Sequence, residues 1–105
     1  MSSSEQGSSL TIECTQEHST PVVRLVGDLD IATVSKAHEA LGDVEDPAGS
    51  GVVFDLGDVT FMDSSGIGFL LTALGRFGRV RLRNPSSLIR EVIQMTGLAD
   101  SLPVE

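Results

Sequence analysis

The sequence predicts a single α/β domain in which helices pack on a mixed sheet of about four to five strands. Short runs rich in β-branched residues alternate with stretches in which apolar residues recur at helical spacing. Their order is strand, strand, helix, strand, helix, strand, helix, which is typical of an α/β layer. The chain has 105 residues, the usual length of one domain, and neither an internal repeat nor an internal boundary is evident.

The first elements are a leader and a hairpin. Residues 1–9 are rich in serine and too poor in apolar side chains to offset the entropy of ordering them, so we expect a flexible leader and a domain of residues 10–105. Residues 11–16 and 21–26 favour strands, and the polar turn between them predicts a hairpin. The sequence Gly-Asp-Leu-Asp at residues 27–30 ends the second strand.

A first helix is predicted from residue 33 onward, because apolar residues then recur at i, i+3, i+4 and i+7. Asp30 or Thr33 can cap its first turn. Its apolar side carries Ala37, Ala40, Leu41 and Val44. The glycines and acidic residues of 42–51 then break the pattern and predict a loop.

The central strand is predicted at residues 52–56, a nearly continuous apolar run that is typical of a strand covered on both faces. We expect a loop over residues 58–65 and then a helix that stops at Gly78. The apolar stripe of that helix consists of Ile67, Leu70, Leu71, Leu74 and Phe77.

A further strand at residues 80–83 and a last helix complete the domain. The helix opens at Ser86 or Ser87 and ends at Gly97, and Pro103 restricts the following segment to an edge strand or a tail. We expect one face of this helix to carry Leu88, Val92 and Met95, with Ile89 and Ile93 beside it.

The composition narrows the classes of function. Seven basic residues against fifteen acidic ones give a formal charge of −8, which argues against nucleic acid and against an anionic membrane as partners. Cys14 is the only cysteine, so neither a disulfide framework nor a cysteine-rich metal site is expected. No signal-peptide pattern and no apolar run of about 20 residues is present, so we expect a cytoplasmic protein.

The segment Asp-Ser-Ser-Gly-Ile-Gly at residues 63–68 stands between the central strand and the second helix. A single cap residue would account for Asp63 or Ser64 and is worth about 1 kcal/mol. Three cap formers in a row exceed that need. Gly66 and Gly68 also remove side chains from the first helical turn at a cost of roughly 1 kcal/mol each, which suggests that some other group approaches this turn closely.

Enzymatic sites fit this segment poorly. A hydrolase elbow requires glycine two residues before its serine, and Met62 and Asp63 occupy those places. A phosphate-binding loop requires a lysine after its glycines, yet the only lysine is Lys36. His18 and His38 are poorly placed as bases, and no spacing indicates a metal site. We therefore expect no catalytic residue, no cofactor and no metal.

The chain resembles the STAS domain of bacterial anti-sigma factor antagonists in three segments. These are LVGDLD at residues 25–30, FDLGDVTFMDSSGIG at 54–68 and SSLIREVIQMTGLADSLPV at 86–104. The resemblance implies a single STAS-type domain. It also implies that the anti-sigma factor, itself a serine kinase, phosphorylates Ser64, with Ser65 as the fallback, and that a serine phosphatase removes the phosphate.

In such a protein the unphosphorylated form binds the anti-sigma factor and frees the sigma factor, as in partner switching during sporulation or stress responses. The resemblance places the binding surface at the turn with Gly27, Asp28 and Asp30 and at the helix start. That start contributes Asp63, Ser65 and Gly66. Asp28 stands where the family has Glu, which keeps the charge and shortens the reach. The turn should lie beside Ser64 if both strands share one sheet edge.

Two other functions remain open at this stage. STAS domains also serve as adaptor subunits of lipid-transport complexes, and neighbouring genes would distinguish that role from sigma regulation. A small serine hydrolase would instead show covalent labelling of Ser64 by a fluorophosphonate, which we do not expect.

Overall fold

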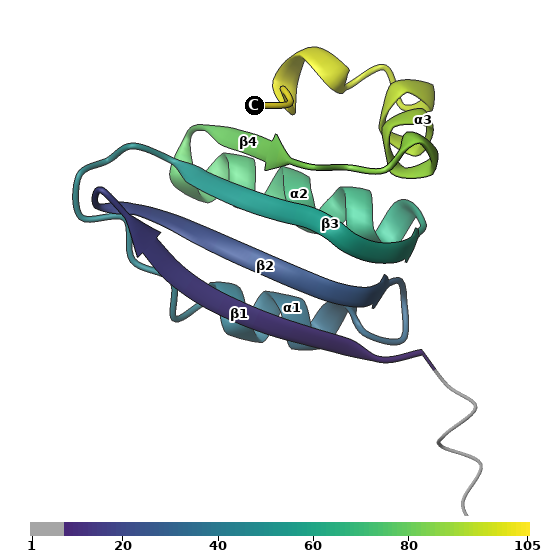
Figure 1. The fold of residues 1–105 in the computed structure, drawn as a ribbon, viewed down its shortest axis with the longest axis horizontal. Coiled ribbons are helices and arrows are strands. Elements are labelled where there is room, and N and C mark those ends of the chain that lie inside the picture. The colour runs from purple at the N-terminus through teal and green to yellow at the C-terminus, as the bar shows by residue number, and fades with distance from the viewer. Residues whose placement is uncertain (1–7) are drawn as a thin grey trace, which may run out of the picture.

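The computed structural model describes residues 8–105, which form one four-stranded sheet in the order β1-β2-β3-β4 (Figure 1). Most of the predicted leader, residues 1–7, lies outside the described residues. The elements are β1 (Leu10–Glu17), β2 (Thr20–Leu29), α1 (Val34–Leu41), β3 (Val52–Met62), α2 (Ser64–Phe77), β4 (Val80–Arg83), α3 (Ser87–Met95) and a short 3₁₀ helix (Ala99–Ser101).

The sheet is mixed, as predicted. β1 and β2 are antiparallel and joined by a tight turn in which His18 and Ser19 both have positive φ, the backbone of a hairpin turn that matches strand twist. β3 pairs in parallel with β2 and with β4. Crossovers between parallel strands are right-handed, so α1 and α2 both lie on the same face of the sheet (Figure 1).

The core fills the space between the sheet and these helices. β3 is the central strand, and its first half is buried as its apolar run predicts. The core is mainly aliphatic, with the rings of Phe54 and Phe69 packed edge to face at 5.3 Å. The opposite face of the sheet carries ion pairs, among them Arg83 with Glu17 at 3.0 Å and with Glu105 at 2.6 Å. One face therefore holds the main core, and the other carries the ion pairs together with the buried Val22 and Val53.

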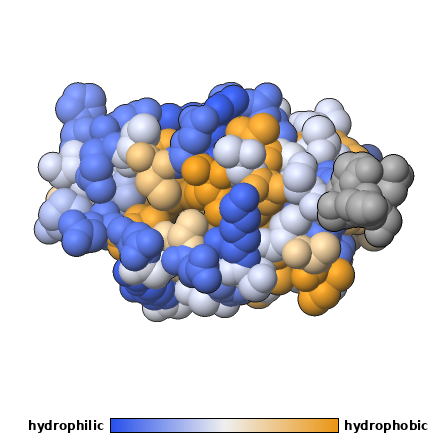
Figure 2. Space-filling view, turned by 90° about the horizontal axis from the view of Figure 1, so that it is seen from below, coloured by the Kyte–Doolittle hydropathy of each residue, from blue (hydrophilic) through white to orange (hydrophobic). Residues whose placement is uncertain are grey.

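The edge strand β1 is partly protected on its open side. Figure 2 looks at this edge with α1 beside it and shows apolar surface crossed and surrounded by hydrophilic side chains. Lys36 Nζ on α1 donates a hydrogen bond to the Leu10 carbonyl at 2.6 Å. A lysine placed at a sheet edge disfavours pairing with another strand.

The loop predicted for residues 58–65 is wrong, because β3 continues to Met62. β2 also continues to Leu29 and pairs with this part of β3. The register of the pairing shifts twice, between Arg24 and Val26 and between Gly27 and Asp28. Val59 and Met62 are buried along this polar stretch. Pairing across the sheet thus overrides a local sequence that favours a loop.

The apolar face predicted for the last helix is also wrong. Ser86 caps α3 as expected, its Oγ accepting the Ile89 N–H at 3.2 Å. Ile89 and Ile93 are buried, whereas Leu88 is 55% and Met95 85% exposed. α3 packs on β3 past the end of β4 (Figure 1), and this docking selects the isoleucine side of a wide apolar arc.

Truncation of Ile89 and of its neighbour Leu88 should separate the two faces of α3. Ile89→Ala leaves a cavity in the core and is expected to cost about 2–5 kcal/mol. Leu88→Ala is expected to stay within about 0.5 kcal/mol of wild type. Urea unfolding of both variants checks this, and equal losses of stability would contradict the observed orientation of α3.

The two glycines at the start of α2 differ in their surroundings. A Cβ on Gly66 would come within 2.9 Å of the Leu29 carbonyl oxygen and 2.6 Å of Met62 Cγ. A Cβ on Gly68 would meet nothing within 4 Å. The close neighbour expected at Gly66 is therefore β2 of the same chain, and only Gly68 leaves open space at the surface.

Alanine at these glycines should change stability in opposite directions. Gly66→Ala must displace the end of β2 and is expected to cost about 1–3 kcal/mol. Gly68→Ala and the control Gly75→Ala, also without neighbours within 4 Å, should each gain about 0.5–1 kcal/mol from helix propensity. Thermal and urea unfolding test this, and a stabilised Gly66→Ala would rule out the close packing.

Candidate functional site

The candidate site lies at the carboxyl ends of β2 and β3, at the right-hand end of the sheet in Figure 1. These strands are parallel neighbours, so the segments that follow them emerge at the same edge. Leu29 pairs with Met62, and the Asp63 N–H donates to the Leu29 carbonyl at 3.4 Å. The predicted turn at residues 27–30 is not a separate turn, because β2 runs to Leu29 and only Asp30 follows it. We keep the name turn at residues 27–30 for this strand end, which the structure brings beside the start of α2, as expected for strands that share an edge.

Ser64 is the first residue of α2 and is exposed. Asp63 caps the helix, with its Oδ1 accepting the Ser65 N–H at 2.8 Å, so the hydroxyl of Ser64 is not the cap. Ser65 is half-buried. The N–H groups and dipoles at a helix start favour a negative group, so a phosphate on Ser64 is compatible with the helix.

Asp28 is held by contacts from separate segments of the chain. Its N–H donates to the Ser9 carbonyl at 2.9 Å, and its own carbonyl accepts the Thr33 hydroxyl at 2.8 Å. The Thr60 hydroxyl donates to Asp28 Oδ1 at 2.9 Å. The carboxylate is thereby fixed in place at the edge of the sheet, close to the start of α2.

Asp30, expected to meet a partner together with Asp28, is instead turned into the domain and is only 8% exposed. Its Oδ1 accepts the N–H groups of Ala32 at 3.0 Å and Thr33 at 3.2 Å, and Ser8 Oγ donates to its Oδ2 at 2.5 Å. The prediction that Asp30 caps the first helix is thus close to its observed role, although Thr33 is the residue at the cap position.

The hydrogen bond from Ser8, followed by those from Ala32 and Thr33, lowers the pKa of Asp30 despite its burial. A lowered folded-state pKa means that the ionised carboxylate stabilises the fold at neutral pH. That contribution is lost as the pH falls through the lowered value. Asp30 therefore stabilises the turn through hydrogen bonds inside the domain and does not present its charge to a partner.

Gly27 and Gly66 are needed by the fold itself. Gly27 has φ +114°, and a Cβ there would come within 2.3 Å of the Ser9 carbonyl oxygen. Gly66 is buried against Leu29, as described above. Both residues belong to the predicted binding set, but their lack of a side chain is already explained by contacts within the chain.

Several residues near the site were not predicted from the sequence. Thr60 and Thr33 support Asp28, and no local pattern marks them because the contacts depend on strand pairing. Ile31, which follows the turn, is 76% exposed, and Phe61, which pairs with Asp28 across the sheet, is 46% exposed. Large apolar side chains exposed at this end of the sheet could contribute to a contact with another protein.

The histidines do not complete a catalytic triad with Ser64. His18 lies in the β1–β2 turn, at the opposite end of β2 from the site. The His38 ring packs edge-on against Phe69 at 5.2 Å. This placement agrees with the prediction that neither acts as a general base for Ser64.

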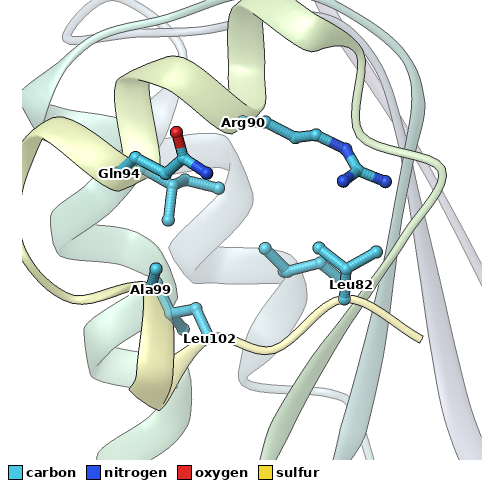
Figure 3. Close-up of a pocket in the computed structure, with 7 residues that line it drawn as sticks. Leu82, Arg90, Gln94, Ala99 and Leu102 are labelled. Carbon is cyan, nitrogen blue, oxygen red and sulfur yellow. The ribbon is translucent and has the colours of Figure 1, made fainter.

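A small cavity lies away from this site, between α3, β4 and the C-terminal segment (Figure 3). Its volume is about 80 Å³, and it is lined by Leu82, Arg90, Ile93, Gln94, Ala99, Leu102 and Val104. In Figure 3 Arg90 and Gln94 project from α3 on one side of the cavity, with Leu82, Ala99 and Leu102 on the other. A cavity of this size is far smaller than the roughly 300–1,000 Å³ of ordinary ligand pockets.

Within residues 8–105, no group of three or more His, Cys, Asp or Glu side chains is arranged to hold a metal ion. No helix in this part of the chain is long and apolar enough to cross a membrane.

The chain is similar to several bacterial proteins along most of its length. An anti-sigma F factor antagonist from Lysinibacillus sphaericus is 33% identical over 84 residues, which cover 75% of this chain and 72% of the relative. An anti-sigma factor antagonist from Mycobacterium paratuberculosis has a similar structure, with a TM-score of 0.76 and 28% identity over 91% of this chain and 85% of that one.

The anti-sigma factor antagonist SpoIIAA is similar in two forms. Its unphosphorylated form matches with a TM-score of 0.68 and 28% identity, covering 92% of this chain and 88% of that one. The phosphorylated form of the Bacillus protein matches with a TM-score of 0.63 and 27% identity, covering 92% and 91%. The family model described as STAS domain matches residues 11–105. The chain belongs to the STAS domain family.

Proposed function

We propose that this protein is an anti-sigma factor antagonist that is switched by phosphorylation of Ser64. The unphosphorylated form binds an anti-sigma factor with serine kinase activity and releases the sigma factor, and the phosphorylated form does not bind. The observation that carries the proposal is the exposed Ser64 at the start of α2, which packs against the strand end that carries Asp28. The names of the similar proteins support the same role.

The chain acts here as a binding protein and not as an enzyme. Its kinase partner supplies the phosphoryl transfer, and a serine phosphatase restores the binding form. SpoIIAA, known in unphosphorylated and phosphorylated forms, offers a precedent for this cycle. The proposed location of the exchange is the cytoplasm, where sigma factors act.

Electrostatic repulsion explains how one phosphate would switch binding. A phosphoserine carries about −1.5 to −2 charges at neutral pH. It would lie next to Asp63 and near Asp28, in a chain with a formal charge of −8. Binding to a partner surface that fits a neutral hydroxyl would remove water from this charge, which costs free energy. The start of α2, in contrast, tolerates the added negative charge. The phosphate therefore acts on docking and leaves the fold intact.

Apolar contacts complete the proposed interface. Ile31 and Phe61 supply exposed apolar surface near Asp28, and Gly68 leaves the first turns of α2 without a side chain that could block close approach. The surface thus combines an apolar area with a fixed carboxylate, which fits an apolar partner surface that carries a basic side chain.

Incubation with the cognate kinase and ATP should place one phosphate on Ser64. The enzyme for the assay is the purified serine-kinase anti-sigma factor of the organism that encodes this chain, and phosphopeptide mapping identifies the site. Ser64→Ala should remove the label, and the control Ser65→Ala should retain it. Label found only on Ser65 would overturn the assignment, and a kinase that binds without labelling the chain would remove the switch.

Ser64→Asp should weaken binding to the same anti-sigma factor without unfolding the domain. A carboxylate at this helix start is expected to stabilise α2 by about 0.3–1 kcal/mol. Binding is measured by titration calorimetry and stability by thermal unfolding. A fall in melting temperature that parallels the loss of binding would mean that Ser64 acts through the fold.

Asp28→Asn removes one charge and keeps an oxygen that can accept the Thr60 hydroxyl. A charge-assisted contact to a basic partner group is worth roughly 1.5–3 kcal/mol, so affinity for the anti-sigma factor should fall about ten-fold or more. The control is Asp43→Asn, which removes one charge from an exposed residue just after α1. Equal affinity of Asp28→Asn and wild type would exclude this turn from the interface.

A further inference from the structure

The residues just before β1 continue its antiparallel pairing with β2, so that Ser9 falls opposite Asp28. Ser9 and Ser8 belong to the segment predicted to be a flexible leader, yet both are placed against the domain. The Ser9 carbonyl accepts the Asp28 N–H at 2.9 Å, and Ser8 Oγ donates to Asp30 Oδ2 at 2.5 Å. These two bonds attach the leader to the turn.

Gly27 is the residue that permits this approach. Its φ of +114° is a conformation that side-chain-bearing residues rarely adopt, and a Cβ would come within 2.3 Å of the Ser9 carbonyl oxygen. The register of the β2–β3 pairing also shifts between Gly27 and Asp28. The backbone here is therefore shaped so that the leader can cross it closely.

The carboxylate of Asp30 connects the leader to the rest of the site. One oxygen accepts Ser8, and the other accepts the N–H groups of Ala32 and Thr33. The Thr33 hydroxyl in turn donates to the Asp28 carbonyl. A contact made by Ser8 is thus transmitted through Asp30 and Thr33 to the backbone of Asp28.

We propose that Ser8 is a positioning residue for partner binding, and that its contact with Asp30 holds the turn at residues 27–30 in the shape that presents Asp28. We call the pair of contacts made by Ser8 and Ser9 the leader clip. This inference rests on the proposed function for the identity of the partner. Its structural half, that the clip fixes the turn, concerns the free protein and can be tested alone.

The mechanism is a restriction of conformations. Without Ser8, one oxygen of a mostly buried carboxylate loses its hydrogen bond, and the turn gains other conformations in which Asp28 is displaced. Apparent affinity falls in proportion to the fraction of molecules that keep the competent shape. A loss of about three- to ten-fold is expected for one hydrogen bond of ordinary strength.

The chain offers a closely matched set of variants. Ser8→Ala removes the hydroxyl, and Ser8→Thr keeps one as a conservative rescue. Ser8→Asp places a carboxylate against Asp30 and should be the most disruptive. The control is Ser9→Ala, because Ser9 contributes its backbone carbonyl, which the substitution leaves in place.

The first measurement uses the full chain without a partner. The pKa of the Asp30 carboxyl, followed by NMR titration, should rise toward its ordinary value in Ser8→Ala and stay low in Ser8→Thr and Ser9→Ala, because Ser8 is the main cause of the lowered pKa. Hydrogen exchange at the Asp28 N–H should also become faster in Ser8→Ala. If neither quantity changes, the clip is absent in solution and the proposal fails.

The second measurement is titration of the purified serine-kinase anti-sigma factor of the same organism with each variant. Ser8→Ala should bind about three- to ten-fold more weakly and Ser8→Asp more weakly still, with Ser8→Thr and Ser9→Ala like wild type and every variant folded at the assay temperature. Equal affinity of Ser8→Ala and wild type overturns the positioning role. Failure of wild type itself to bind overturns the proposed function, and the measurements on the free chain then decide separately whether the clip exists.

Discussion

The structure of the site depends on the close packing of the start of α2 against the carboxyl end of β2. Gly66 lies so near the Leu29 carbonyl that a Cβ would approach it to 2.9 Å. Because β2 and β3 are parallel neighbours, this contact sets the first turn of α2 directly beside the turn that follows β2. A larger residue at position 66 would separate Ser64 from Asp28, and the two parts of the proposed interface would no longer form one surface.

The residues that form the sequence motifs divide into two physical groups. Gly27, Asp30 and Gly66 are constrained by contacts within the domain, while Asp28 is half-buried and Ser64 is exposed. A motif of this kind therefore records packing needs and recognition needs together. Its presence is good evidence for the fold, whereas evidence for binding comes from the exposed members alone.

Much of the fold could be predicted from local patterns. The hairpin, the buried first half of β3, the end of α2 at Gly78 and the cap at Ser86 each depend on residues close in sequence. The predictions were wrong where contacts between residues far apart in sequence determine the structure. β3 is extended to Met62 by its pairing with β2, and the buried face of α3 is chosen by its docking on β3.

The candidate site shows the same limit. The Asp-Ser-Ser-Gly segment stands out in the sequence because its cap-forming residues exceed what one helix start needs, and the choice of Ser64 within it came from the resemblance to anti-sigma factor antagonists. The support of Asp28 by Thr60 and Ser9 could not be predicted, because hydroxyls and backbone carbonyls in unrelated segments leave no periodic signal. The exposed Ile31 likewise looks like any apolar residue until its surroundings are known.

The identity of the helix cap gives the proposed switch its physical logic. If the Ser64 hydroxyl capped α2, a phosphate there would alter a bond on which the helix start depends, and modification would act on folding and binding together. Asp63 performs that role instead, with its Oδ1 on the Ser65 N–H. The hydroxyl of Ser64 is therefore not needed as the cap of α2. It lies at the positive end of the helix, where added negative charge is tolerated. The apparent excess of cap formers is thus a separation of tasks: one side chain holds the helix, and its neighbour can change charge without disturbing it.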